Sequence, residues 1–169
     1  MDLRRMGELR LEWIDIPDPR MDEIARTLAD HPRMAGYYIL RLVDITAIRA
    51  RVSEDRMLDA AFEHFDGRIW PAFEERVGLG SWSEYEATSK DARAEVIGAL
   101  IGGGAIGHIN DTMSAVLAAQ IWERFEALFA DDRKYFIGLG LGDRKYVFQS
   151  GAAIVDATRA GFIGVVEDD

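Results

Sequence analysis

Residues 34–52 read MAGYYILRLVDITAIRARV, and the interpretation of this stretch decides the expected fold. Apolar side chains occur almost all round a helical projection of it, interrupted by Arg41, Asp44, Arg49 and Arg51. A helix that is apolar on nearly every side is usually central and buried. Arg41 and Asp44 lie three residues apart, so on a helix they would pair on one face. The stretch therefore predicts a buried central helix.

Further helices are indicated by apolar side chains spaced three and four residues apart behind a capping residue. Asp18-Pro19 is a favourable helix start, because Asp is a good N-cap and Pro fits the first helical position. The most regular apolar stripe runs from Thr112 to Phe129. The helices predicted in this way cover residues 18–31, 53–66, 71–77, 92–101 and 112–129.

The C-terminal third has a different pattern. Residues 135–142, YFIGLGLG, alternate strictly, which is typical of a strand, and 145–150, KYVFQS, are a candidate partner strand. Residues 151–160 are ambiguous, and 161–168 are interpreted as strand or tail. The expected fold is therefore α+β, a single predominantly α-helical domain over residues 1–169 with a small β element in its C-terminal third. An all-α helical bundle is the alternative.

The composition restricts the classes of function. The 169 residues contain no cysteine, which excludes disulfides, thiol catalysis and cysteine-ligated metal sites. The formal net charge is −10, which disfavours binding to nucleic acid and to anionic membrane surfaces. The N-terminal residues are charged throughout and the longest apolar run is shorter than a membrane span. These features predict a soluble, acidic, cytoplasmic protein.

Residues 98–111, GALIGGGAIGHIND, contain five glycines and allow two interpretations. Residues 102–107 satisfy G-x-G-x-x-G, but a dinucleotide site also needs an acidic residue about twenty positions further on, after a second strand. The alternative is that one helix ends at a left-handed Gly102 and that Asn110 or Asp111 caps the next. The spacing of Gly98, Gly102, Gly103 and Gly107 would then let another backbone approach closely. We favour close packing and capping.

His108, Asn110 and Asp111 form the densest polar group beside an apolar segment, and they are the candidate ligand-binding residues. A histidine near a carboxylate is a candidate general base or metal ligand. A partly buried histidine beside a helix cap explains the same residues without any ligand. We predict no metal and no cofactor, and no catalytic residue can be assigned.

Two classes of function remain open. The first is a non-catalytic protein-interaction or regulatory domain that self-associates, with another protein or a second copy as partner. Its basis is an aromatic-rich helix at 112–129 and the glycines suited to close packing. The second is a small-molecule-binding or cofactor-binding protein, or an enzyme, that uses a pocket near His108, Asn110 and Asp111.

Overall fold

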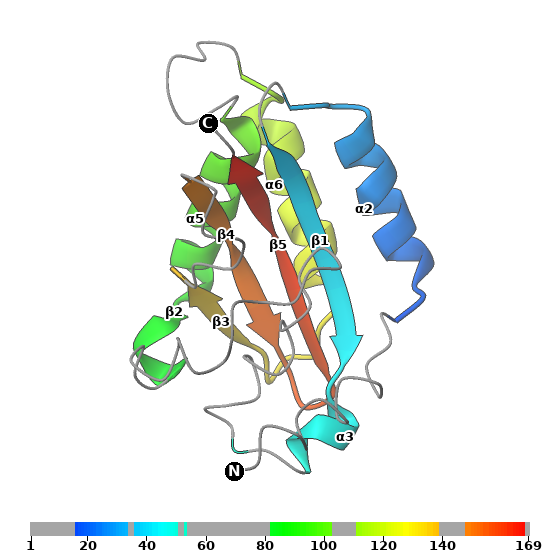
Figure 1. Ribbon diagram of the computed structural model, residues 1–169, viewed down its shortest axis with the longest axis vertical. Coiled ribbons are helices and arrows are strands. Elements are labelled where there is room, and N and C mark those ends of the chain that lie inside the picture. Colours follow the sequence, from blue (N-terminus) through cyan, green and yellow to red (C-terminus); the bar gives the residue numbers. More distant parts are fainter. Residues whose placement is uncertain are drawn as a thin grey trace.

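A five-stranded antiparallel sheet is the centre of the fold in the computed structural model (Figure 1). The structure describes residues 16–33, 36–50, 53, 82–102, 111–138 and 148–167. The strands are β1 (Tyr37–Asp44), β2 (Glu86–Ala87), β3 (Lys134–Ile137), β4 (Phe148–Val155) and β5 (Arg159–Glu167). Their order is β1-β5-β4-β3-β2, and every neighbouring pair is antiparallel.

Three helices pack against one face of this sheet: α2 (Pro19–Ala29), α5 (Ser89–Ile101) and α6 (Ala115–Glu126). Two shorter elements are α3 (Thr46–Arg49) and a 3-10 turn, η4 (Trp82–Tyr85). Figure 1 shows α6 between α5 and α2, and α5 lies over β3, β4 and β5. None of the described helices is long and apolar enough to cross a membrane.

Each of the three helices begins at a side chain that accepts a backbone N–H. Asp18 accepts from the N–H of Arg20 in α2, Thr88 from Asp91 in α5, and Ser114 from Leu117 in α6. Such caps satisfy N–H groups that have no partner within the helix. The predicted helices at 18–31, 92–101 and 112–129 are confirmed. The cap of α6 is Ser114, however, and not the predicted Asn110 or Asp111.

The prediction of a predominantly helical domain is wrong, and the main reason lies in residues 34–52. Residues 37–44 of this stretch form β1, which pairs with β5 along its whole length, and only 46–49 are helical. Arg41 and Asp44 therefore do not pair across a helix turn; the Asp44 carboxylate instead accepts the backbone N–H of Thr46. The all-helical alternative is excluded by the same sheet.

The C-terminal third contains more strand than the sequence suggested. The ambiguous residues 151–160 contain the end of β4, the hairpin turn and the start of β5, and 161–167 continue β5. Strand β3 covers residues 135–137 of the predicted 135–142 strand, and residues 139–142 lie outside the described ranges. The helices predicted at 53–66 and 71–77 lie outside the described residues, apart from Ser53.

The core lies between the helices and the sheet. Its largest fully buried side chains include Trp122 and Phe125 of α6, Ile24 of α2 and Ile163 of β5. Gly161 of β5 allows α6 to approach, because a Cβ there would lie 2.6 Å from the Phe129 ring and 2.9 Å from the Phe125 ring. The described side chains on the second face of the sheet include buried ones as well. They include Ile39, Val43, Phe136, Ala153, Phe162 and Val166.

Candidate functional site

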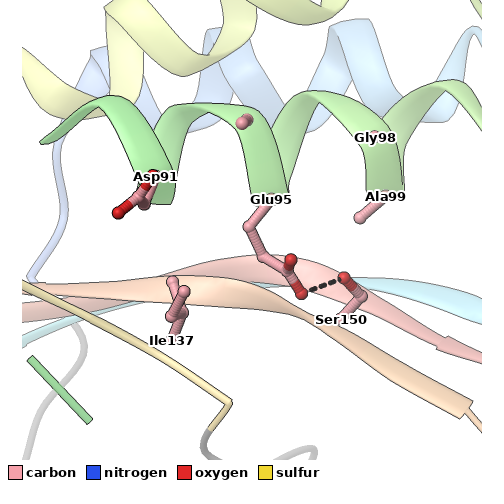
Figure 2. Close-up of a pocket in the computed structure, with 7 residues that line it drawn as sticks. Asp91, Glu95, Gly98, Ala99, Ile137 and Ser150 are labelled. Carbon is pink, nitrogen blue, oxygen red and sulfur yellow. Dashed lines mark hydrogen bonds between the residues drawn. The ribbon is translucent and has the colours of Figure 1, made fainter. Parts of the chain in front are cut away.

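A groove of about 490 Å³ lies between α5 and the sheet. One wall is α5, which contributes Asp91, Ala94, Glu95, Gly98 and Ala99 to the lining; Ile137 of β3 and Ser150 of β4 form the other wall. Figure 2 shows the helix residues in sequence along α5, with Ile137 and Ser150 facing them from the strands. Asp91, Ala94 and Gly98 are exposed, so the groove is open to solvent.

The helix period places both carboxylates on the groove wall. Asp91 and Glu95 are four residues apart, which puts their side chains one turn apart on the same helix face. The strands contribute through their alternation. Ile137 pairs with Ala152 across β3 and β4, and Ser150 lies two residues before Ala152 on the face that carries Ala152 toward the helices.

The electrostatics of the groove are set by these two carboxylates. The Ser150 hydroxyl donates a hydrogen bond of 2.6 Å to Glu95 Oε1, as the dashed line in Figure 2 shows. This hydrogen bond orients the Glu95 side chain. Neither Asp91 nor Glu95 forms an ion pair with an arginine or lysine in the described part of the chain. Among the described residues that line the groove, the charged side chains are therefore both acidic.

Glu126, at the end of α6, provides a contrast. Its carboxylate accepts hydrogen bonds from Tyr135 and from Ser89, and it lies 3.6 Å from Nη2 of Arg133. Arg133 also donates a hydrogen bond of 2.6 Å to the Tyr135 hydroxyl. Among the contacts that raise the pKa of the Arg133 guanidinium, this hydrogen bond has the largest effect. This cluster is internally satisfied, whereas no arginine or lysine in the described ranges forms an ion pair with the groove carboxylates.

The candidate residues from the sequence have different positions. Gly98 lines the groove, but a Cβ added there would meet no described atom within 4 Å, so no backbone approaches closely at this point. Gly102 ends α5 as predicted, although its φ of −58° and ψ of 131° are not left-handed. Asp111 is exposed and is not part of the groove. Gly103, Gly107, His108 and Asn110 lie outside the described residues.

The end of α5 is held by side chains from other segments. Nη1 of Arg33 donates to the carbonyls of Ala99 and Gly102 at 3.1 and 2.7 Å, and the Thr112 hydroxyl donates to Gly102 at 3.1 Å. Hydrogen-bond donors at a helix C-terminus satisfy the last carbonyl groups, which have no partner within the helix. A positive charge there also interacts favourably with the helix dipole. These contacts explain the position of Gly102 without a bound phosphate.

The sequence analysis did not identify Asp91, Glu95 or Ser150 as site residues. The four-residue spacing of the two acids was visible, but it is also typical of an ordinary solvated helix face. Ser150 is 55 positions from Glu95 in the sequence, and it lies close to Glu95 because β4 packs directly against α5. No group of three or more potential metal ligands occurs within the described ranges.

Comparisons of the chain with protein-family models, with curated protein sequences and with solved structures found no match. The function is therefore inferred from the chemistry of the groove.

Proposed function

We propose that this chain is a non-catalytic protein-interaction domain whose α5 groove binds a basic side chain of its partner. The observation that carries the proposal is the pair of carboxylates, Asp91 and Glu95, on one groove wall. Two carboxylates on one wall give the groove a negative potential, which attracts a cation. Ser150 holds Glu95 in position for this contact.

The rest of the lining suits the carbon chain of a lysine or arginine. Ala94, Ala99 and Ile137 are apolar and add contact surface to the charged end of the groove. Lys and Arg side chains combine an apolar stem with a charged head, and they bury the stem while the head contacts the anion. An open groove of this kind fits a side chain presented on a protein surface.

The charge of the whole chain favours a basic partner over a second copy. Two molecules that each carry a net charge of −10 repel each other at low ionic strength. The aromatic residues Trp122 and Phe125 of α6, and Phe129 just after it, are buried in the core of the domain, so they do not supply an interface for self-association. Self-association through the groove is an outcome that the experiment below also detects.

The test is an amide chemical-shift titration with n-butylguanidinium, which reproduces the end of an arginine side chain. We expect a dissociation constant on the order of millimolar, with shifts centred on Asp91, Glu95, Gly98 and Ser150. n-Butylurea, its uncharged counterpart of the same shape, is expected to produce no saturable shifts. Analytical ultracentrifugation of the same samples reports any self-association.

Two matched double variants distinguish binding in the groove from nonspecific attraction of the cation to an acidic protein. Asp91→Asn with Glu95→Gln removes two charges while keeping the shapes, and we expect about a tenfold loss of affinity. Asp30→Asn with Asp132→Asn removes two exposed charges outside the groove lining, and binding should persist. Equal binding by the two double variants, or equal binding of the urea, would contradict the proposal.

A further inference from the structure

The second face of the sheet, opposite α2, α5 and α6, is apolar and buried in the described part of the chain. Its side chains alternate along the strands with those that face the helices. Those on the second face are Ile39, Val43, Phe136, Ala153, Phe162 and Val166, and the most exposed of them, Phe136, is 7% exposed. The three described helices that pack on the sheet lie against its other face. The second face therefore requires a cover of its own.

Phe162 of β5 shows this requirement most clearly. Its ring lies against two glycines, because a Cβ at Gly151 would be 2.7 Å from the ring and a Cβ at Gly164 would be 2.9 Å from it. The strand backbone therefore covers the side of the ring that faces the sheet, while the other side points away from the strands. Phe162 is nevertheless only 5% exposed. Another part of the chain therefore covers the outer side of this ring.

The connection between α3 and η4 joins opposite edges of the sheet. Helix α3 follows β1 at one edge, where Nη2 of Arg49 donates to the Asp156 carbonyl at 2.8 Å (Figure 1). The turn η4 leads directly into β2 at the other edge. Five strands at ordinary spacing span about 19 Å. Because α2, α5 and α6 occupy one face, the route that remains for this connection runs over the second face.

Residues 53–66 of this connection have the sequence expected of a cover. They are predicted to form a helix whose apolar side chains gather on one face, namely Met57, Leu58, Ala61, Phe62 and Phe65. Glu63 lies on the opposite side of the helical projection. A helix of this length extends about 21 Å, which is enough to reach across the sheet.

We infer that residues 53–66 occupy the second face of the sheet as an amphipathic helix, with Phe62 and Phe65 directed at the strands. Burial of apolar surface is the driving force, and the two aromatic rings supply most of it. The fold then has three layers, with helices on both faces of the sheet. This inference is independent of the groove. It also removes the second face as a binding surface, so that a partner protein meets the layer of α2, α5 and α6 or an edge of the sheet.

The first test is a set of nuclear Overhauser effects in the full chain, measured between phenylalanine rings and labelled methyl groups. We expect contacts from the rings of Phe62 and Phe65 to the methyl groups of Val43 and Ala153, which lie on the second face. The methyl groups of Ile121, in α6, are expected to show no contact with either ring. A mixture of labelled and unlabelled chains distinguishes contacts within one chain from contacts between two copies.

The second test compares the melting temperatures of two neighbouring alanine variants. Phe62→Ala removes a ring from the apolar side of the helix, and we expect it to lower the melting temperature by about 6–15 °C. Glu63→Ala, one position further on, changes the opposite side and is expected to shift the melting temperature by less than about 2 °C.

Three results would overturn the inference. The first is contacts from the Val43 and Ala153 methyl groups to other segments, with none from Phe62 or Phe65. The second is contacts between labelled and unlabelled chains, which would mean that a second copy covers the face. The third is equal melting temperatures for the two alanine variants. The butylguanidinium titration tests the groove separately, so none of these results decides the proposed function.

Discussion

Asp156 shows how one buried carboxylate joins two parts of the chain that are distant in sequence. It is 5% exposed and follows β4 at the turn of the β4–β5 hairpin. One carboxylate oxygen accepts the N–H groups of Thr158 and Arg159 at 2.9 and 2.7 Å, and the other accepts the N–H of Ala130 at 2.9 Å. The side chain therefore ties the hairpin turn to the segment that follows α6.

The hydrogen bonds also set the charge state of Asp156. Burial raises the pKa of its carboxyl, but the N–H donors of Ala130, Thr158 and Arg159 and the charge of Arg159 lower it by more. The pKa is therefore below its ordinary value, and folding favours the ionised form. The stability that this carboxylate contributes is present above the unfolded pKa of about 3.9 and is lost as the pH falls through the folded pKa.

We predict that Asp156→Asn lowers the free energy of unfolding by about 1–3 kcal/mol at pH 7, measured by urea denaturation. The asparagine oxygen still accepts the N–H groups of the turn. Its NH2 group, however, then faces the N–H of Ala130, and because both groups are hydrogen-bond donors this contact is lost. The difference from wild type should shrink as the pH falls below about 4. Asp132→Asn, an exposed control, should change stability by less than about 0.5 kcal/mol. A difference that stays constant down to pH 3 would contradict this account of Asp156.

The candidate site could be predicted only in part at the scale of single residues. The spacing of Asp91 and Glu95 fixes a shared helix face once α5 is known to be helical. Whether that face meets water or a groove depends on the sheet, and no local pattern indicated that Ser150 would lie beneath it. His108 and Asn110 were chosen for their local density of polar groups, and that prediction remains untested because they lie outside the described residues.

At the scale of elements, the helices predicted at 18–31, 92–101 and 112–129 were confirmed, whereas a strand buried on both faces was mistaken for a helix. Helix α2 has a cap, a Pro at its start and an apolar face, and each of these signals is local. Strand β1 alternates between the helix-side core, through Leu42, and the buried second face, through Ile39 and Val43. A strand with two buried faces is apolar throughout and loses the period-two pattern. This is why residues 34–52 resembled a buried helix.

The hairpin of β4 and β5 requires a pair of glycines, and the sequence pattern did not indicate this requirement. Gly151 and Gly164 are directly opposite each other in the ladder, and the Phe162 ring lies across both. A Cβ at Gly164 would collide with the Ser150 carbonyl and would lie 2.9 Å from the Gly151 Cα. The two strands therefore approach at this pair more closely than any side chain allows.

We predict that Gly164→Ala lowers the free energy of unfolding by about 3 kcal/mol, because the colliding atoms belong to the backbone of the neighbouring strand. Gly98→Ala serves as the matched control, since it adds the same methyl group where space is open, and it should raise stability by about 1 kcal/mol. Urea denaturation of both variants checks the pair. A loss below about 1 kcal/mol in Gly164→Ala would mean that the strands separate easily at this point.

At the scale of the whole molecule, the groove results from the way one helix lies on the sheet. Helix α5 packs over β3, β4 and β5 and against α6 (Figure 1). Apart from its two carboxylates, the groove wall formed by this helix consists of small residues, Ala94, Gly98 and Ala99, and Ser150 opposite them is also small. Small side chains on both walls leave a gap, and the two carboxylates give that gap its charge.

The central claim is that a cation binds in this gap, and intermolecular nuclear Overhauser effects test it most directly. The sample is the full chain with saturating n-butylguanidinium. The predicted result is a set of contacts from the butyl methylenes to the Gly98 Hα protons and to the methyl groups of Ala99 and Ile137, all of which disappear in the Asp91→Asn, Glu95→Gln variant. Contacts to residues outside the groove, or contacts that persist in that variant, would contradict the claim.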